Sequence, residues 1–284
     1  MTLCMVAICD EGPERRIVFC ADRRAEVGWA GGEVAWKIKV GGANLFALIA
    51  GETSKAEDLL STSRDLTLGF RPSVTDNLFD KFNEISSAHK KKLCERFVQK
   101  RLGITFERFL ANGATELTPE IRNQVLHQLT ELDFGCEILL IGFSDAEPFI
   151  FEIDQFGEVI QHDNFGAIGT GAVIAKSILY QRRQIMGLTL EYTLYNLYEA
   201  SRLARIAPGV GEITEFGVMT CKKKDESLNS LRVTTPACLE KLDETFKIVG
   251  PQELTTPLVL DESCFRWTGY RKKAVSGEGS ESGG

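Results

Sequence analysis

Residues 2–51 decide the fold, and they read TLCMVAICDEGPERRIVFCADRRAEVGWAGGEVAWKIKVGGANLFALIAG. Two apolar runs, Thr2–Cys9 and Arg16–Ala21, are rich in β-forming residues and are separated by the turn DEGPE. Val34–Val40 alternates apolar side chains with lysines, which is typical of a strand with two different faces. Asn44–Ala50 is a further apolar run after a Gly-Gly turn. The stretch therefore predicts four successive strands.

The chain turns helical after this block. We expect a helix to begin at about Glu52, and apolar residues recur at helical spacing between positions 76 and 133, with the charged run HKKK (89–92) on the outer face. Thr118-Pro119-Glu120 has the composition of a helix start, namely a hydroxyl cap, a proline and an acid in the first turn. Residues 76–133 are therefore predicted to be a helical stretch.

Strands and helices continue to come in blocks downstream. The patterns predict strands at Cys136–Phe143, Phe149–Ile153 and Ile213–Cys221, and helices at Gly171–Gln184, at about Leu190–Arg205 and at Ala237–Val249. Because strands do not alternate regularly with helices, we expect an α+β fold in which antiparallel sheets carry helices on their outside.

No linker divides the chain. We expect one domain over residues 1–250, a C-terminal extension over 251–275 and a disordered tail over 276–284, whose sequence SGEGSESGG has no apolar anchor.

Composition excludes several classes of protein. With 43% hydrophobic and 26% charged residues among 284, the chain has the balance of a soluble globular protein rather than of a disordered one. A net charge of −7 argues against nucleic acid as a partner, which would need a basic face. No apolar run approaches the ~20 residues that span a bilayer, and the start lacks the basic segment of a signal peptide. We expect a cytoplasmic protein without a membrane partner.

Neither cysteine nor histidine forms a recognisable site. The eight cysteines lack the C-x-x-C spacing of a zinc site, and we interpret them as free, buried thiols. The histidines (His89, His127 and His162) belong to no catalytic or metal-binding motif. The sequence predicts no metal and no cofactor.

Thr2 is a candidate nucleophile because it opens the first strand. Initiator methionine is normally trimmed before a small residue, and its loss would leave an α-amine and a hydroxyl on one residue. An α-amine with a pKa of about 7.7–8.0 is a usable base near neutral pH. A threonine hydroxyl needs such a base to become a nucleophile. By itself this signal is weak, since threonine commonly follows methionine.

Motifs downstream of Thr2 strengthen the case for it as a nucleophile. The strand ending in Ala21-Asp22-Arg23-Arg24, the Trp36-Lys37-Ile38 segment and Ala50-Gly51 before a helix resemble the proteasome β-subunit family, and most closely its bacterial, ancestral β-subunit type. The resemblance covers the first 60 residues well and residues 136–221 less specifically. It implies a four-layer αββα sandwich, that of the N-terminal nucleophile (Ntn) hydrolases.

The resemblance also implies roles for single residues. Thr2 would be the nucleophile, Asp22 and Lys37 its carboxylate and lysine partners, and Gly51 the donor to the oxyanion. A nearby lysine lowers the cost of deprotonating a hydroxyl, and a carboxylate keeps that lysine oriented. Taken singly, Asp22 is better explained as a turn or surface carboxylate and Lys37 as a solvated strand lysine. Only the ordered set favours catalysis.

A second motif, Gly166-Ala-Ile-Gly169-Thr170-Gly171, leads into a helix. The run Gly169-Thr-Gly-Ala-Val-Ile-Ala175, with Glu191 downstream, is similar to a dinucleotide fingerprint, but the polar segment before it does not fit a buried parallel strand. The family carries a G-S-G turn here, whose serine supports the nucleophile, and Thr170 retains the hydroxyl. A helix-start turn without a catalytic role is the alternative.

One motif departs from the family. Where the family has an aspartate and a serine before the last core strand, this chain reads Ala207-Pro-Gly-Val-Gly-Glu212. In the family these two residues support accessory hydrogen bonds to the threonine amine, so their absence counts against catalytic activity. Glu212 or Glu215 is a possible substitute, although a surface role fits both.

The sequence thus predicts a threonine-type amide hydrolase, a peptidase acting on peptide or amide substrates. As in the family, we expect a homo-oligomer, either a ring or a helical stack. The alternatives are a catalytically silent ring or scaffold subunit and a small-molecule amidase of the same fold, with a nucleotide-binding module further behind.

Overall fold

A computed structural model of the chain describes residues 2–11, 14–27, 30–32, 37–42, 45–67, 75–144, 146–220 and 230–251. Within these residues, two five-stranded sheets form, and every strand pair in them is antiparallel. The first sheet has the order β10-β1-β2-β11-β12, with bounds Phe165–Ile168, Cys4–Glu11, Glu14–Asp22, Thr214–Thr220 and Ser230–Val233. The second has the order β5-β6-β7-β8-β9, with bounds Ile38–Gly42, Leu45–Gly51, Cys136–Ser144, Glu147–Ile153 and Val159–Gln161.

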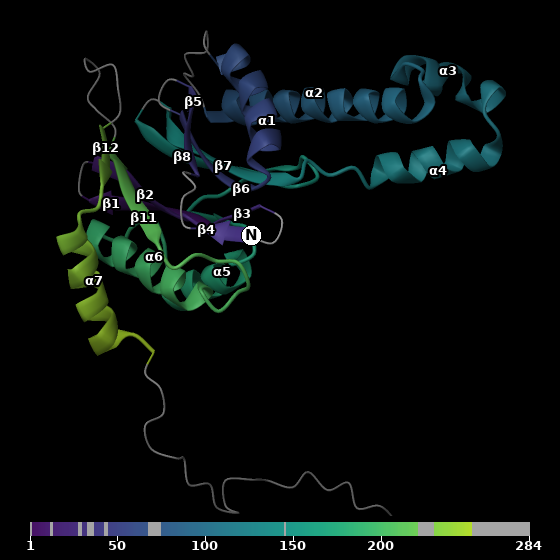
Figure 1. Cartoon of the computed structure of the whole chain (residues 1–284). Coiled ribbons are helices and arrows are strands. Elements are labelled where there is room, and N and C mark those ends of the chain that lie inside the picture. The colour runs from purple at the N-terminus through teal and green to yellow at the C-terminus, as the bar shows by residue number, and fades with distance from the viewer. Residues whose placement is uncertain are drawn as a thin grey trace, which may run out of the picture.

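Helices cover the outer face of each sheet, so the molecule has four layers (Figure 1). Helices α1 (Thr53–Thr67) and α2 (Thr75–Leu102) pack on the second sheet. Helices α5 (Ala172–Gln181), α6 (Leu190–Ala204) and α7 (Pro236–Val249) pack on the first. The α+β class and the αββα layering expected from the sequence are confirmed, and the sandwich is consistent with the Ntn-hydrolase fold.

The core between the sheets is built by alternation along the strands. Val6 and Phe19 from the first sheet meet Leu48, Leu139 and Ile141 from the second, and all five are almost completely buried. Successive residues of a strand face opposite sides, so the intervening residues of the same strands join the two outer clusters under the helices. Burying an aliphatic or aromatic side chain of this kind contributes about 1.5–3 kcal/mol.

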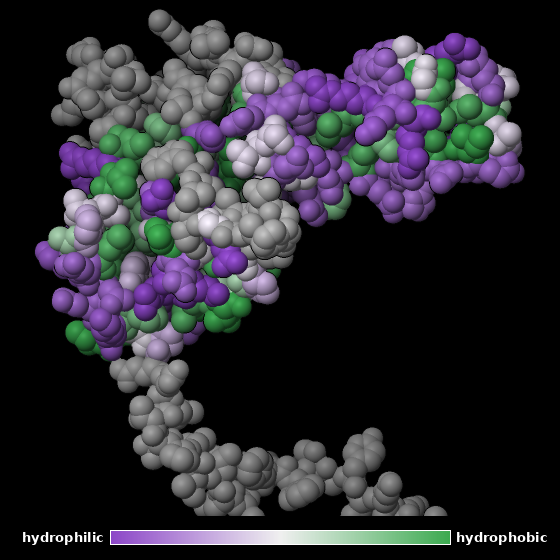
Figure 2. Space-filling model, viewed as in Figure 1, coloured by the Kyte–Doolittle hydropathy of each residue, from purple (hydrophilic) through white to green (hydrophobic). Residues whose placement is uncertain are grey.

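An arm of helices projects from the sandwich. The C-terminal half of α2 leaves the sheet and packs with α3 (Phe106–Glu116) and α4 (Pro119–Thr130) (Figure 1). The arm has a small core of its own around Val98, Phe109 and Val125. Figure 2 shows apolar side chains at its tip within a largely hydrophilic surface. The predicted helical stretch is therefore three helices, and only the first half of α2 belongs to the sandwich.

Several predictions about single elements are corrected. The run at 89–92 does not lie wholly on an outer face, because His89 is only 2% exposed and packs edge-on against Phe134, with ring centroids 4.9 Å apart. A short antiparallel pair that the sequence does not predict, β3 (Ala25–Val27) with β4 (Ala30–Gly32), follows Arg24. The strands β9, β10 and β12 have no counterpart among the strands that the sequence predicts.

Other predictions fall partly outside the described residues. The strand expected at Val34–Val40 begins at Ile38, and residues 33–36 lie outside the described part of the chain. So do the extension and the tail, apart from Pro251. No helix among the described residues is long and apolar enough to cross a membrane.

Candidate active site

Thr2 and Asp22 meet because two strands of the first sheet are paired. Strand β1 runs antiparallel to β2, with Cys4 opposite Ala21. The ladder extends one step further, since the backbone N–H of Asp22 donates to the carbonyl of Leu3 at 3.0 Å. This register places Thr2, at the start of the first strand, beside the Asp22 side chain at the end of the second.

Lys37 reaches the same point from the other sheet. It stands immediately before β5, and its side chain is 11% exposed. Its Nζ donates to Asp22 Oδ1 at 2.7 Å and also to the hydroxyl of Thr2. The Thr2 hydroxyl in turn donates to Asp22 Oδ1 at 2.6 Å. The three side chains therefore form one closed hydrogen-bonded cluster between the two sheets.

The Asp22 carboxylate has donors on both oxygens. Besides the Thr2 and Lys37 side chains, Oδ1 accepts the backbone N–H of Leu3 at 2.8 Å, and Oδ2 accepts that of Gly211 at 2.9 Å. The side chain is fully buried. A buried carboxylate is costly unless it is paired with a cation and hydrogen-bonded, and Asp22 meets both conditions. The cluster is thus a stable arrangement that fixes the orientation of the Thr2 hydroxyl.

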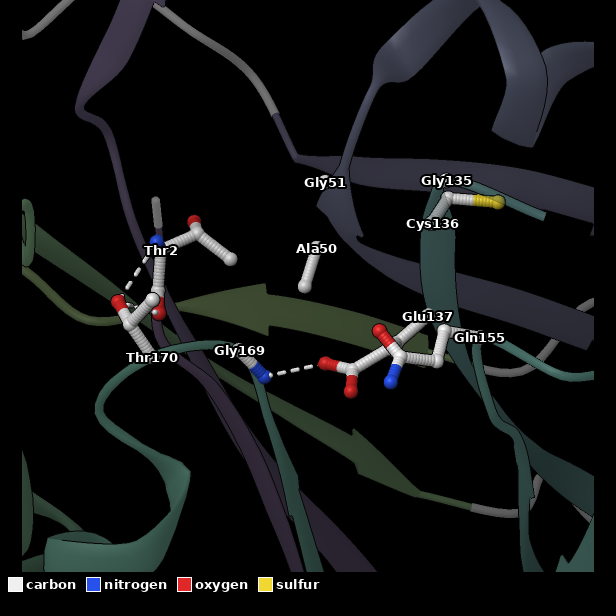
Figure 3. Close-up of a pocket in the computed structure, with 9 residues that line it drawn as sticks. All are labelled: Thr2, Ala50, Gly51, Gly135, Cys136, Glu137, Gln155, Gly169 and Thr170. Carbon is white, nitrogen blue, oxygen red and sulfur yellow. Dashed lines mark hydrogen bonds between the residues drawn. The ribbon is translucent and has the colours of Figure 1, made fainter. Parts of the chain in front are cut away.

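The turn after β10 holds the backbone of Thr2. Thr170 Oγ1 accepts the N–H of Thr2 at 3.3 Å and lies 3.3 Å from its carbonyl oxygen (Figure 3). Gly169 has φ +91°, and a Cβ there would lie 2.4 Å from the Thr2 carbonyl oxygen. Only glycine fits this close approach without strain. The strand that leads into this turn, β10, pairs antiparallel with β1, so it is not the parallel strand of a dinucleotide-binding unit.

The loop that departs from the family still contacts the cluster, but through its backbone. Gly211 N–H donates to Asp22, and the Pro208 carbonyl oxygen lies 3.3 Å from Thr170 Oγ1. Glu215, one of the two suggested substitutes, pairs instead with Arg23 at 3.6 Å, while burial raises the pKa of its carboxyl. The other, Glu212, is exposed.

A cavity of about 350 Å³ opens beside Thr2. The remaining residues that line it are Ala50, Gly51, Gly135, Cys136, Glu137, Gln155, Gly169 and Thr170 (Figure 3). Gly51 has φ +94°, and a Cβ on it would lie 2.6 Å from the carbonyl oxygen of Gly135. The structure thus brings together all five residues singled out in the sequence, four of them (Thr2, Asp22, Lys37 and Thr170) by direct hydrogen bonds and Gly51 by sharing the cavity with Thr2.

Two thiols lie near this cluster and are poor nucleophiles. Burial raises the pKa of Cys136 to about 12, and its sulfur points away from Thr2 (Figure 3). Burial also raises the pKa of Cys4, which hydrogen-bonds to the carbonyl of Ile49 at 3.4 Å. The thiolate is the reactive form, so both thiols stay inert at neutral pH. Across the described ranges, no group of three or more His, Cys, Asp or Glu side chains is arranged to hold a metal ion.

Sequence reasoning missed two contributors. Glu137 lines the cavity, and its Oε2 accepts the N–H of Gly169 at 2.7 Å. The signal for it is a single acid in the otherwise apolar strand CEILLIGF. Gly211 acts only through its backbone N–H, for which the side-chain sequence carries no signal.

Comparison with known families gives one match, which covers part of the chain. Residues 100–195 match the family model described as proteasome subunit. The matched stretch is about a third of the chain; it includes Thr170 and Glu137 but not Thr2, Asp22, Lys37 or Gly51. No curated protein shows significant similarity to the chain. Over residues 100–195, the chain is therefore similar to proteasome subunits, and its two-sheet sandwich is consistent with their fold.

Proposed function

We propose that the chain is a threonine-type amide hydrolase, a peptidase whose nucleophile is the Thr2 hydroxyl after removal of Met1. One observation carries the proposal: the Thr2 hydroxyl hydrogen-bonds to both the Lys37 ammonium and the Asp22 carboxylate, next to a cavity of about 350 Å³. A cation on a hydroxyl oxygen stabilises the developing alkoxide and so activates a weak nucleophile.

The reaction would proceed in two halves. Thr2 Oγ1 attacks the carbonyl carbon of the amide, while the freed α-amine of Thr2 takes the hydroxyl proton. The Gly51 N–H stabilises the negative oxygen of the tetrahedral intermediate. The proton then passes to the leaving amine, which departs and leaves the acyl group as an ester on Thr2. Water attacks the carbonyl carbon of this ester while the α-amine takes a proton from it. The α-amine then returns that proton to Thr2 Oγ1 as the ester bond breaks, which releases the acid and restores the hydroxyl.

The remaining residues position these groups. Asp22 holds Lys37 against the Thr2 hydroxyl, and Thr170 holds the nitrogen that becomes the α-amine. Each contact fixes a reacting atom before substrate arrives, which lowers the entropic part of the barrier. The loop that lacks the family's aspartate and serine supports these residues through its backbone, since Pro208 contacts Thr170 and Gly211 contacts Asp22.

A scaffold subunit of the same fold is the second candidate. It is favoured by the loop at residues 207–212, which lacks the aspartate and the serine that the resemblance implies there. A small-molecule amidase is the third, because a cavity of about 350 Å³ is near the lower end of the range for ligand pockets.

The test is hydrolysis of fluorogenic amides by wild type, Thr2→Ser and Thr2→Ala. A panel of short peptide amides and small acyl amides separates a peptidase from an amidase. We expect Thr2→Ala to lose hydrolysis and Thr2→Ser, which keeps a hydroxyl, to retain part of it. Hydrolysis that survives in Thr2→Ala would disprove the role of Thr2, and a folded wild type inactive on every amide would favour the scaffold.

A further inference from the structure

Glu137 occupies a position on β7 where an apolar residue would be expected. Side chains alternate along a strand, and Leu139 and Ile141 fill the core between the sheets. Glu137 is the next residue on that face, and it pairs across the sheet with Ala50, a member of the same core. The inner face of β7 therefore ends in a carboxylate at the point where the core gives way to the cavity.

The backbone holds this carboxylate in place. Glu137 is half-buried, and its Oε2 accepts the N–H of Gly169 at 2.7 Å. Figure 3 shows the side chain reaching across the cavity toward Gly169, with Gln155 next to it. Because one oxygen is anchored, the second stays at the cavity wall as an acceptor for a ligand.

Glu137 also sets the charge of the cavity. Among the described residues that line it, Glu137 is the only one with an ionisable acid or base as side chain besides the thiol Cys136, whose raised pKa of about 12 keeps it neutral. The two nearby cations are each paired with a carboxylate: Lys37 with Asp22 at 2.7 Å, and Lys55, which lies against Gly135, with Glu52 at 3.2 Å. A single carboxylate on low-dielectric walls raises the local concentration of cations.

We propose that Glu137 is a specificity-determining residue, and that the cavity binds an ammonium or guanidinium group of the substrate next to the scissile amide. This inference rests on the proposed function of Thr2. A guanidinium forms charge-assisted hydrogen bonds to carboxylates, and the Gln155 side-chain carbonyl lies on the same wall as a further acceptor. Substrates with an acidic group at this position are repelled.

The competing explanation is that Glu137 only holds the turn at Gly169. Glu137→Gln separates the two roles, because the amide oxygen of glutamine still accepts the Gly169 N–H whereas the charge is gone. Glu120→Gln is the matched control, since Glu120 is exposed on the first turn of α4, in the arm.

The first experiment measures kcat/KM for three peptide amides that differ only in the residue before the scissile bond, which is Arg, norleucine or Glu. We expect wild type to prefer Arg over norleucine by about tenfold or more, and to cleave the Glu peptide least. Glu137→Gln should lower kcat/KM for the Arg peptide by about tenfold or more and leave norleucine within about threefold. Glu120→Gln should leave all three unchanged.

The second experiment does not need catalysis. Calorimetry measures binding of acetyl-Ala-Ala-Arg amide and acetyl-Ala-Ala-norleucine amide to full-length Thr2→Ala and to Thr2→Ala with Glu137→Gln. We expect tighter binding of the Arg peptide to the first protein and equal binding of both peptides to the second.

Three outcomes decide between the claims. Equal loss for all three substrates in Glu137→Gln would make Glu137 a structural clamp and overturn the inference. Cleavage without any preference for Arg would overturn it as well, while the role of Thr2 stands. If none of the peptides is cleaved, the proposed hydrolase activity is wrong. The binding experiment alone then decides whether the cavity binds a cationic group.

Discussion

At the scale of single residues, the site depends on one carboxylate that organises groups from distant parts of the chain. Asp22 accepts hydrogen bonds from residues 2, 3, 37 and 211. In the sequence, only the order and spacing of Thr2, Asp22, Lys37 and Gly51 indicate that these residues form one site. Each of them taken alone is explained by a structural role without chemistry. The backbone donor Gly211 and the cavity carboxylate Glu137 follow from tertiary packing, which the local sequence does not encode.

Lys37→Ala should abolish reaction of Thr2 with an electrophile, a loss on the order of 10² or more, because the hydroxyl loses its activating cation. It also leaves Asp22 buried without its cation, which costs about 3–5 kcal/mol of folding free energy. Labelling and denaturant unfolding measure the two effects. Lys39→Ala is the control, since Lys39 pairs with the exposed Glu57 at 3.1 Å instead. Normal labelling in folded Lys37→Ala would remove Lys37 from the mechanism.

Gly169→Ala should destabilise the protein and slow the reaction of Thr2. The substitution combines a left-handed backbone with a Cβ placed 2.4 Å from the Thr2 carbonyl oxygen. Gly103→Ala is the matched control, because Gly103 has φ +68° but a Cβ added there would meet no atom within 4 Å. Strain alone costs about 1–3 kcal/mol, and we expect only Gly169→Ala to impair Thr2 labelling. Equal effects of both substitutions on labelling would show that the close approach is irrelevant.

At the scale of elements, long helices and long strands follow from sequence pattern, and short strands do not. Helix α4 begins where Thr118 and Pro119 predict, and the Thr118 hydroxyl accepts the N–H of Ile121. Strands β9, β10 and β12 have only three or four residues, too few for an alternation to be recognised. The sequence misplaces His89 because its charged neighbours suggest an outer face, whereas the edge of Phe134 covers its ring.

The burial of His89 on α2 predicts a pH dependence of stability. Burial lowers the pKa of His89 below its ordinary value of 6.5, and the nearby Lys92 and Arg96 act in the same direction, against Asp58. The unfolded chain therefore binds a proton at His89 at higher pH than the folded one, so this contribution to stability is present above about pH 6.5 and is lost as pH falls below it.

The measurement is the melting temperature from pH 7.5 to pH 5. We expect wild type to lose more stability over this range than His89→Leu, which has no proton to take up. His127→Gln is the control, since His127 is exposed on α4. A His89→Leu profile parallel to that of wild type would contradict the prediction.

At the scale of the whole molecule, the four layers leave two apolar side chains exposed on the outer side of α5. Val173 and Tyr180 are seven residues apart, and they are 77% and 71% exposed. Residues seven apart lie on the same side of a helix. Proteasome subunits, to which part of the chain is similar, form rings, and we predict that this face joins copies of the chain.

Light scattering should give a mass above 31.5 kDa for wild type and a shift toward the monomer for Val173→Asp. Leu110→Asp is the control: Leu110 is 64% exposed in the arm, away from α5. A wild type that stays at 31.5 kDa would contradict assembly. A loss of assembly in Leu110→Asp but not in Val173→Asp would show that the contact between copies lies in the arm.

The central claim, that Thr2 becomes an N-terminal nucleophile, is tested most directly by mass spectrometry of the protein after incubation with an acylating β-lactone. The mechanism predicts a chain that lacks Met1 and carries one acyl group, which fragmentation assigns to Thr2, and no acyl group on folded Thr2→Ala. A folded wild type that retains Met1, or that is acylated elsewhere while Thr2 stays unmodified, would contradict it.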